Sequence, residues 1–229
     1  MAAQVLHSEV LDALTREIVG GELQTGAVLT LERIQQRFAV SRTVARECMR
    51  MLEQLQLVTS RRRVGIVVRP REDWDVLSPR VIRCRLDGSA RADQLRSLSE
   101  LRRAVEPVAA ASAARLATPA ERARVLELGL GLRQLGEAGR LEEFLERDIA
   151  FHGMLLRASH NEMFAALTDA IAEVLAGRTR HGLMPLQPEP EALDAHEAVA
   201  RAVHDGDSAA AELWMGILMA ELRGAMDDA

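Results

Sequence analysis

Lysine and tyrosine are absent from this chain, and the remaining aromatic residues are scarce. Arginine supplies all 29 of the Lys and Arg positions, and aromatic side chains make up 3% of the 229 residues, of which 48% are hydrophobic. A core with so few rings has to be packed from aliphatic side chains. Together with the abundance of Ala, Leu, Arg and Glu, this composition favours packed helices over sheets, and the length suits two modest domains.

The chain also lacks a long apolar run and a basic segment followed by an apolar one at its start. No stretch approaches the roughly 18 consecutive apolar residues of a membrane span, so neither export nor membrane insertion is expected. The two cysteines, Cys48 and Cys84, do not have the spacing of a metal finger. They are expected to be reduced, buried thiols of a cytoplasmic protein.

The net charge of −5 hides an asymmetry between the first third of the chain and the rest. Residues 1–72 carry 11 Arg against 8 acidic residues, a net charge of +3, whereas residues 73–229 carry 18 Arg against 26, a net charge of −8. The excess is sharpest over residues 33–63, where eight arginines accompany only Glu47 and Glu53. A basic patch on an acidic body is the pattern of phosphate contact, so the first third is predicted to bind nucleic acid.

Three helices are predicted in this basic third. The first covers residues 6–19, where apolar side chains recur at every fourth position. A short helix over 31–38 follows a loop and has Thr30 as its expected N-cap. After a tight turn, Ser41 is expected to cap a further helix that runs to about Leu55.

A hairpin is predicted next, from two β-rich runs at 57–60 and 64–68 that flank three consecutive arginines. Helix, short helix, turn, helix and hairpin is the order of a winged helix-turn-helix, whose second closely spaced helix enters the major groove of DNA. Arginines at the start of that helix can bind guanine bidentately, and hydroxyls and hairpin arginines can reach phosphates. The alternative is a solvated arginine face in which Ser41 is only a cap. The predicted DNA contacts are Arg33, Ser41, Arg42, Thr43, Arg46, Arg61, Arg62 and Arg63.

The rest of the chain, from about residue 80, is predicted to be a compact bundle of helices. A long helix runs from about 95 to 116 with a kink at Pro107, and Thr118-Pro-Ala-Glu is the pattern of a strong helix start. No internal period of about 20–50 residues occurs, which argues against a solenoid. Further helices are predicted over 140–159, 161–178, 191–205 and 208–226.

One of these helices carries Asp148 and His152, four residues apart. This spacing puts a carboxylate and an imidazole on the same face of the helix. Such a pair can begin a metal site or form an ordinary surface pair. The residues alone leave both readings open.

Four N-terminal segments carry a recognisable pattern: Leu29-Thr-Leu-Glu-Arg-Ile, Val40-Ser-Arg-Thr-Val-Ala-Arg-Glu, Met51-Leu-Glu-Gln-Leu-Gln-Leu-Val and the wing-like Arg61-Arg-Arg-Val-Gly-Ile-Val-Val. They resemble the GntR family of bacterial regulators. The run from Trp74 to Leu86 is similar to the connector of that family's FadR branch. The family commonly has Pro at the position of Val44 and Ala at that of Cys48, and neither position contacts bases. The resemblance puts the best candidates for DNA contact at Arg33, Arg42, Thr43 and Arg46.

Residues 95–226 resemble the FCD domain, the all-helical effector domain of the FadR branch. Many of its members bind a divalent metal through one Asp and three His, and the resemblance carries three of these ligands onto Asp148, His152 and His196. The fourth position falls on Leu218, which has no lone pair. A metal of the zinc, nickel or manganese class would therefore need water or the effector as a further ligand. A metal-free pocket with hydrogen-bonding Asp148 and His152 is equally compatible with the sequence.

Arg102 corresponds to an arginine of the family's effector pocket, where a buried guanidinium would pair with a carboxylate or phosphate. The alternative is a surface ion pair with Glu106 at i+4. In the first case the neighbouring Arg103 would face away. The effector-binding residues implied by the resemblance are Arg102, Asp148, His152 and His196.

The expected fold class is mainly α, a winged helix-turn-helix followed by an all-α FCD bundle. The expected domains are a DNA-binding domain at 1–72, a connector at 73–91 and an effector-binding and dimerisation domain at 92–229. The expected function is a cytoplasmic homodimeric regulator, most simply a repressor, that binds an inverted-repeat operator in double-stranded DNA and responds to a small carboxylate such as a sugar acid. The alternatives are a metal-dependent enzyme, which would lack the HExxH general base, and a DNA-binding protein without an effector.

Overall fold

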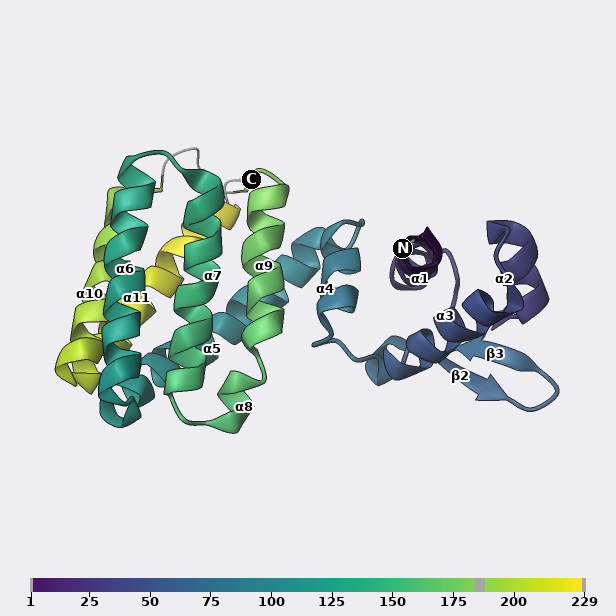
Figure 1. Cartoon of the computed structure of the whole chain (residues 1–229), viewed down its shortest axis with the longest axis horizontal. Coiled ribbons are helices and arrows are strands. Elements are labelled where there is room, and N and C mark those ends of the chain that lie inside the picture. The colour runs from purple at the N-terminus through teal and green to yellow at the C-terminus, as the bar shows by residue number, and fades with distance from the viewer. Residues whose placement is uncertain (1, 184–187, 228–229) are drawn as a thin grey trace. The chain divides into compact units, whose positions relative to one another are not determined.

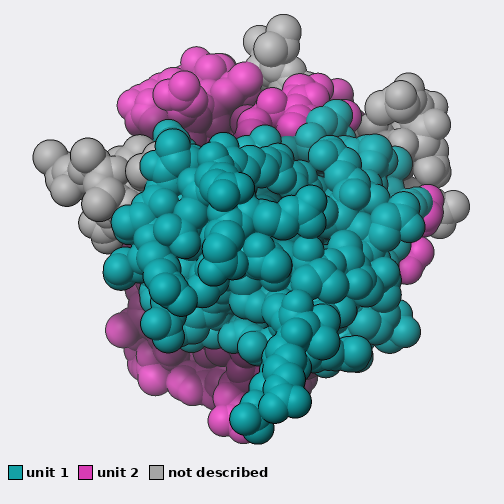
Figure 2. Space-filling model, turned by 90° about the vertical axis from the view of Figure 1, so that its right-hand side faces the viewer, with its two compact units in different colours: residues 1–94 teal, residues 95–229 magenta. Residues whose placement is uncertain are grey.

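The computed structural model describes residues 2–183 and 188–227, with side chains from residue 7 to 183 and from 188 to 220. The chain forms two compact units, residues 1–94 and 95–229 (Figure 2). The N-terminal unit combines helices with a small sheet, and the described part of the C-terminal unit contains helices and no strand (Figure 1). The predicted fold class is therefore confirmed. Among the helices described, none is long and apolar enough to cross a membrane.

The elements of the N-terminal unit follow the predicted order. The hydroxyl oxygens of Thr30 and Ser41 each accept a hydrogen bond of 3.3 Å, from the backbone N–H groups of Arg33 and Val44 respectively. Both predicted N-caps are therefore confirmed, and each satisfies a backbone donor that the helix itself leaves free. The elements are α1 (Ala2–Val19), β1 (Val28–Leu29), α2 (Leu31–Phe38), α3 (Arg42–Gln54), β2 (Val58–Arg61), β3 (Gly65–Val68), the 3₁₀ turn η1 (Arg71–Asp73) and α4 (Pro79–Leu86).

An aliphatic core holds α3 against α1. Leu11 and Leu14 of α1 and Leu52 of α3 are at most 1% exposed, and burying a side chain of this size contributes about 1.5–3 kcal/mol. Cys48 of α3 is fully buried, with its Sγ 3.6 Å from a carbonyl oxygen of α1. Both Cys48 and Cys84 are free, buried thiols, as predicted, and burial raises the pKa of each to about 11. This packing fixes which face of α3 is left for solvent.

The predicted hairpin is present, but the sheet has a third strand. β3 lies between β1 and β2 and is antiparallel to both. β1 has only two residues, too few to produce an alternating pattern that the sequence could reveal. Gly65 of β3 has a φ of +118°, and a Cβ added there would lie 3.0 Å from the carbonyl oxygen of Leu29. The close passage of β3 beside β1 therefore requires glycine at this position.

The predicted connector, residues 73–91, is not a simple linker. It contains α4, whose Val81 is fully buried in the same core as Leu11 and Leu52. The indole Nε1 of Trp74 donates a 3.0 Å hydrogen bond to the carbonyl oxygen of Arg69. Both contacts hold the segment after the wing to the N-terminal unit.

The C-terminal unit contains the predicted helix start at Thr118. Thr118 and Glu121 form a complete capping box, in which each side chain bonds the other residue's backbone N–H. α5 continues through Pro107 without interruption. The elements are α5 (Arg91–Leu116), α6 (Pro119–Glu137), α7 (Leu141–Ala158), α8 (Glu162–Ala165), α9 (Thr168–Arg180), α10 (Pro190–Asp205) and α11 (Ser208–Asp227).

The single helix predicted over 161–178 is wrong, because the chain forms α8 and α9 instead. At the junction the backbone N–H of Leu167 bonds the carbonyl oxygen of Phe164, three residues back, at 3.0 Å. This is the tighter 3₁₀ pattern, which turns the chain without a Gly or Pro. No sequence signal marks the break.

Small residues let the helices of the C-terminal unit approach closely. Ala110, Ala113 and Ala114 of α5 are fully buried. At the contact between α6 and α10, a Cβ added to Gly129 would lie 2.4 Å from the Cβ of Ala200. Because α10 also carries His196, this contact fixes the position of that histidine relative to α6 and α7 (Figure 1).

Candidate functional site

The start of α3 presents the predicted DNA-contacting residues to solvent. Ser41, Arg42, Thr43 and Arg46 are all exposed, while Cys48 and Leu52 bury the other side of the helix. The first turn of α3 contains Arg42 and no acidic residue. A cation there opposes the helix dipole, whose positive end attracts anions. The arrangement disfavours the isolated helix and favours a bound phosphate.

Ion pairing separates the eight arginines between residues 33 and 63 into two groups. Arg37 pairs with Glu17, with Nη1 and Oε2 2.7 Å apart, and Arg50 pairs with Glu47, with Nε and Oε2 3.1 Å apart. The other six are exposed, and their guanidinium groups have no partner in the part of the chain that the structure describes. We call this second group the unpaired arginines: Arg33, Arg42, Arg46, Arg61, Arg62 and Arg63.

The three wing arginines lie at the tip of the β2–β3 hairpin. Arg61 is paired with Gly65 in the strand ladder. The turn is closed by a 3.1 Å hydrogen bond from the N–H of Val64 to the carbonyl oxygen of Arg61, and Arg63 has a φ of 66°. The backbone therefore holds three cationic side chains in solvent at the end of a short, rigid ribbon.

A second group of polar residues lies inside the C-terminal unit. Asp148 and His152 of α7 and His196 of α10 are buried, and one ligand atom from each lies within 4.8 Å of the others. The Oδ1 of Asp148 is 3.0 Å from Nε2 of His196 and 3.3 Å from Nε2 of His152. The structure thus brings together the three residues that the FCD resemblance selects.

The other nitrogen of each imidazole is held by an acceptor. Nδ1 of His196 lies 2.6 Å from the carbonyl oxygen of Ala192, and Nδ1 of His152 lies 2.5 Å from Oε2 of Glu106. Because a carbonyl and a carboxylate only accept, each Nδ1 carries the proton. Both Nε2 atoms lie near the Asp148 carboxylate, where a metal ion could bind to all three side chains. Such outer contacts orient histidine ligands in metal sites.

Glu106 of α5 belongs to this cluster, although its spacing from Arg102 predicts only a surface ion pair. The i,i+4 ion pair exists, but the surface location is wrong, because both side chains are 2% exposed. The Nε of Arg102 donates a hydrogen bond to Oε1 of Glu106, and the Nη2 of Arg102 lies 3.3 Å from Oε2 of the same carboxylate. The same Nη2 is 3.3 Å from Nε2 of His152. Arg103 is exposed, as expected.

Charge pairing inside the cluster shifts its titrations. Burial opposes ionisation of Glu106, but Arg102 and His152 outweigh it and lower its pKa to about 2. Burial likewise opposes ionisation of Asp148, and His152 and His196 hold its pKa well below the ordinary range. Burial disfavours a charged His152, yet Glu106 and Asp148 raise its pKa from 6.5 to about 9. A proton on His152 is thus the cation between the two carboxylates.

A further buried cation, Arg178 of α9, was not found by sequence reasoning. Arg178 is 4% exposed, and its Nε has no hydrogen-bond partner among the described residues. Burial lowers its pKa to about 10, with a further contribution from Arg102, while Asp148 acts in the opposite direction. Ile171 and Leu175 on the same helix pack against α5 and α7, the helices that carry Arg102 and Asp148. The available signal was its spacing: Ile171, Leu175 and Arg178 fall on one face of α9.

The donor set of Asp148, His152 and His196 fits a divalent metal ion, because it offers one carboxylate and two imidazoles with oriented Nε2 atoms. The fourth ligand position does not contribute. Leu218 of α11 is 2% exposed and packs in the hydrophobic core of the unit. A bound metal would be held by three protein ligands.

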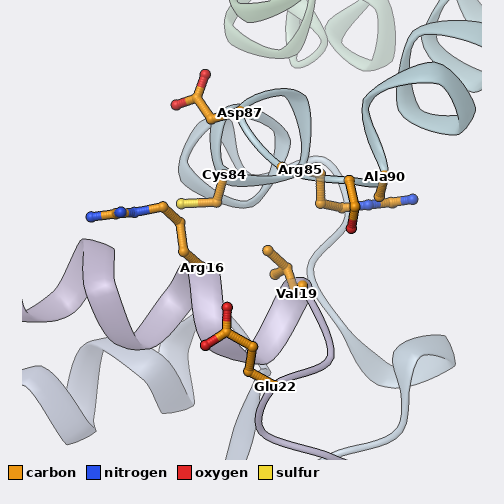
Figure 3. Close-up of a pocket in the computed structure, with 10 residues that line it drawn as sticks. Arg16, Val19, Glu22, Cys84, Arg85, Asp87 and Ala90 are labelled. Atoms are coloured by element: carbon orange, nitrogen blue, oxygen red, sulfur yellow. The ribbon is translucent and has the colours of Figure 1, made fainter.

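A cavity of about 350 Å³ lies in the N-terminal unit, between the end of α1 and the end of α4 (Figure 3). No predicted site residue is among those that line it. Its wall carries Arg16 and Arg85 but also Glu22 and Asp87. Charges of both signs select no single class of ligand, so this cavity is not assigned a function.

Two family models match separate parts of the chain. The model of bacterial regulatory proteins of the gntR family matches residues 6–68, and that of the FCD domain matches residues 97–221. The galactonate operon transcriptional repressor of Escherichia coli K12 is 30% identical over 205 residues, 89% of either chain. The uncharacterized HTH-type transcriptional regulator YieP of the same organism is 28% identical over 91% of either chain.

A solved structure also shares the fold. Lar, which controls the expression of the Listeria monocytogenes agr system, has a TM-score of 0.58 and 15% identity, covering 97% of this chain and 96% of its own. The relatives are transcription regulators, which sets the enzyme alternative aside. This chain therefore belongs to the GntR family of bacterial transcription regulators and carries an FCD domain at its C-terminal end.

Proposed function

We propose that the chain is a homodimeric repressor that acts on DNA in the cytoplasm and responds to a small carboxylate. Two copies would occupy the two halves of an inverted-repeat operator, since a two-fold dimer matches a palindromic site. The repressor assignment is supported by the relative that represses the galactonate operon. The FCD unit would bind the effector.

The observation that carries the DNA-binding part is the division of the arginines. Arg37 and Arg50 are held by carboxylates, whereas the unpaired arginines have no internal partner in the described chain and occupy α2, the start of α3 and the wing. We propose that Arg42, Thr43 and Arg46 contact base edges, and that Ser41, Arg33 and the wing bind phosphates or the adjacent minor groove.

Selection of binding sites from random duplex DNA by the purified protein tests this proposal. The enriched sequence is expected to be an inverted repeat. Arg42→Ala should weaken binding to that sequence by about 1–3 kcal/mol per half-site, with a smaller effect on random DNA. Arg50→Ala is the matched control on the same helix, because Glu47 already holds its guanidinium. Unchanged discrimination between operator and random DNA in Arg42→Ala would remove Arg42 from base readout.

The effector proposal is supported by the charges buried between α5, α7 and α9. Two guanidinium groups, of Arg102 and Arg178, are buried there beside Glu106, Asp148 and His152, and the pKa of His152 is raised to about 9. A buried guanidinium whose Nε has no acceptor among the described residues, as in Arg178, favours a bound anion. A sugar acid is the class to test first, given the galactonate operon relative. The acid would act by binding the DNA-competent and DNA-incompetent states with different affinity.

A divalent metal of the zinc, nickel or manganese class is proposed as an optional part of this site. Asp148, His152 and His196 would hold it, with water or the effector as a further ligand in place of Leu218. Such an ion would supply a Lewis-acidic centre that binds the effector's carboxylate. The residues themselves orient the two Nε2 atoms through Ala192 and Glu106.

The reading without an effector receives no comparable support. A decayed pocket has no reason to keep several charged side chains buried, because their desolvation costs stability unless each is paired. Apolar residues of similar volume would be at least as stable there. The retained polar cluster therefore supports a pocket in use.

A further inference from the structure

The inner face of α9 lies against the helices that carry the cluster. Ile171 and Leu175 of α9 form one buried apolar group with Ala109 of α5 and Leu156 of α7. Arg178 follows Leu175 by three residues and Ile171 by seven, so it lies on the same face, one turn farther along the helix. Figure 1 shows α9 beside α7. Arg178 therefore points into the interior between α5 and α7, on the side where Arg102 and Asp148 lie.

Arg178 is buried in this interior without a hydrogen bond or ion pair to any residue that the structure describes. Its side chain is buried, and no described residue accepts a hydrogen bond from its Nε. A buried guanidinium without acceptors loses its hydration and gains nothing in exchange. Native structures keep such groups where they have a task, because the fold itself gains no stability from them.

Arg102 is in the opposite situation. Both oxygens of Glu106 engage its guanidinium, through Nε and Nη2, and the second carboxylate of the cluster, Asp148, faces the two histidines. The negative charges of the cluster are thus already committed to Arg102 and His152. A ligand carboxylate that entered here would meet an Arg102 already paired with Glu106, whereas the Nε of Arg178 has no acceptor among the described residues.

We infer that Arg178 is the residue that binds the effector's carboxylate, through a bidentate guanidinium–carboxylate pair, and that Glu106 keeps Arg102 as an internal positioning residue. The inference rests on the proposed function. A neutral sugar of the same shape should not bind, because it has no carboxylate to pair with Arg178.

The experiment uses the full-length protein, with sodium galactonate as the probe and galactose as its neutral counterpart. Thermal unfolding and release of the selected operator are measured for the wild type, Arg178→Met, Arg102→Met and the exposed control Arg103→Met. Galactonate should raise the Tm of the wild type and of Arg103→Met, and galactose should not. Arg178→Met should bind galactonate about 10- to 100-fold more weakly, the loss expected for one charge-assisted bidentate contact.

The ligand-free proteins give a second readout that a structural role for Arg178 would not produce. Arg178→Met should unfold about 2–4 °C above the wild type, because an unpaired buried charge is replaced by an apolar side chain. Arg102→Met should unfold below it, because the buried carboxylate of Glu106 loses its partner. An Arg178→Met protein that unfolds below the wild type, or fails to fold, would show a structural role and overturn the inference.

The remaining outcomes separate the inference from the function on which it rests. Equal galactonate affinity in Arg178→Met and the wild type would overturn the role of Arg178 while leaving the effector site intact. A wild-type protein that responds to none of galactonate, lactate and citrate would overturn the carboxylate effector and this inference with it. DNA binding by the unpaired arginines would stand in either case.

Discussion

Leu218 decides how a metal could be held at this site. Asp148, His152 and His196 converge from α7 and α10, while Leu218 contributes only apolar packing from α11. Three ligands bind a divalent ion more weakly than four, and they leave a position open for water or an anion. With leucine at position 218, the site would bind a metal ion more weakly and would keep one coordination position open.

Restoring a ligand at this position should strengthen metal binding. Leu218→His is expected to lower the stability of the metal-free protein by about 1–3 kcal/mol, because a polar ring replaces a buried leucine. Saturating zinc should then stabilise the variant by about 1–3 kcal/mol more than it stabilises the wild type, through binding to the folded state alone. Thermal unfolding with zinc and with a chelator measures both effects.

Leu218→Asn is the control, since it buries a polar group of similar size that is a poor ligand for zinc. A zinc-dependent rise in Tm no larger in Leu218→His than in Leu218→Asn would contradict the three-ligand site. The two variants together separate the cost of polarity from the gain in coordination.

Sequence reasoning reached part of this cluster and missed the rest for a physical reason. Asp148 and His152 are one helical turn apart, a relation that spacing reveals. Glu106 and Arg178 join them only through the packing of α5 and α9 against α7. Packing between helices cannot be predicted from the spacing of residues within one helix. His196 and Arg102 entered through family resemblance and not through any pattern of their own.

Among the elements, the wing depends most on a single residue. Gly65 combines a φ of +118° with close contacts to Leu29 and Val28 of β1. Any side chain there has to distort the backbone or push β1 away. The strand pairing that supports Arg61 and the turn would be disturbed at the same time.

Gly65→Ala is expected to destabilise the N-terminal unit by about 1–3 kcal/mol, from backbone strain and the steric clash together. Operator affinity should fall with it, because the wing arginines lose their fixed position. Gly21→Ala separates the two causes, since Gly21 has a φ of +81° and open space around its Cβ position. Denaturant unfolding and operator binding are the measurements; equal losses in the two variants would mean that contact with β1 is unimportant.

The elements also show where sequence patterns succeed. Thr30, Ser41 and Thr118 were predicted as caps because their side chains act on the backbone three residues away, a local relation. The break between α8 and α9 was missed because a 3₁₀ turn forms there without Gly or Pro. The pairing of β1 with β3 was also not predicted, because it joins segments that are far apart in the sequence.

For the whole molecule, the buried cluster links stability to pH. The pKa of Glu106 is lowered to about 2 and that of Asp148 is also lowered, so their contribution is present above the ordinary carboxyl range and lost as pH falls. The pKa of His152 is raised from 6.5 to about 9, so its contribution is complete below 6.5 and lost as pH rises through 9. Between these two limits, in the weakly acidic range, the contribution of the cluster to the free energy of unfolding is expected to be nearly constant.

In the presence of a chelator, the difference in Tm between the wild type and His152→Gln should be largest at about pH 5–6 and should shrink steadily towards about pH 9. His204→Gln serves as the control, because His204 is exposed and pairs only with its exposed neighbour Asp205. Parallel curves for the wild type and His152→Gln between pH 6.5 and 9 would contradict the assignment of a proton to His152. Unfolding followed by circular dichroism across the pH range provides the test.

The unpaired arginines also have a consequence for how such a regulator changes over time. The guanidinium groups of the unpaired arginines form no hydrogen bond or ion pair with the described residues, so replacing these side chains breaks no such interaction. Exposed positions of this kind tolerate substitution at little cost in stability. A lineage could therefore exchange these side chains, and with them the DNA sequence that is read, while the scaffold and the buried sensor stay unchanged. Duplicated copies of the gene would be free to acquire new operators before they acquire new signals.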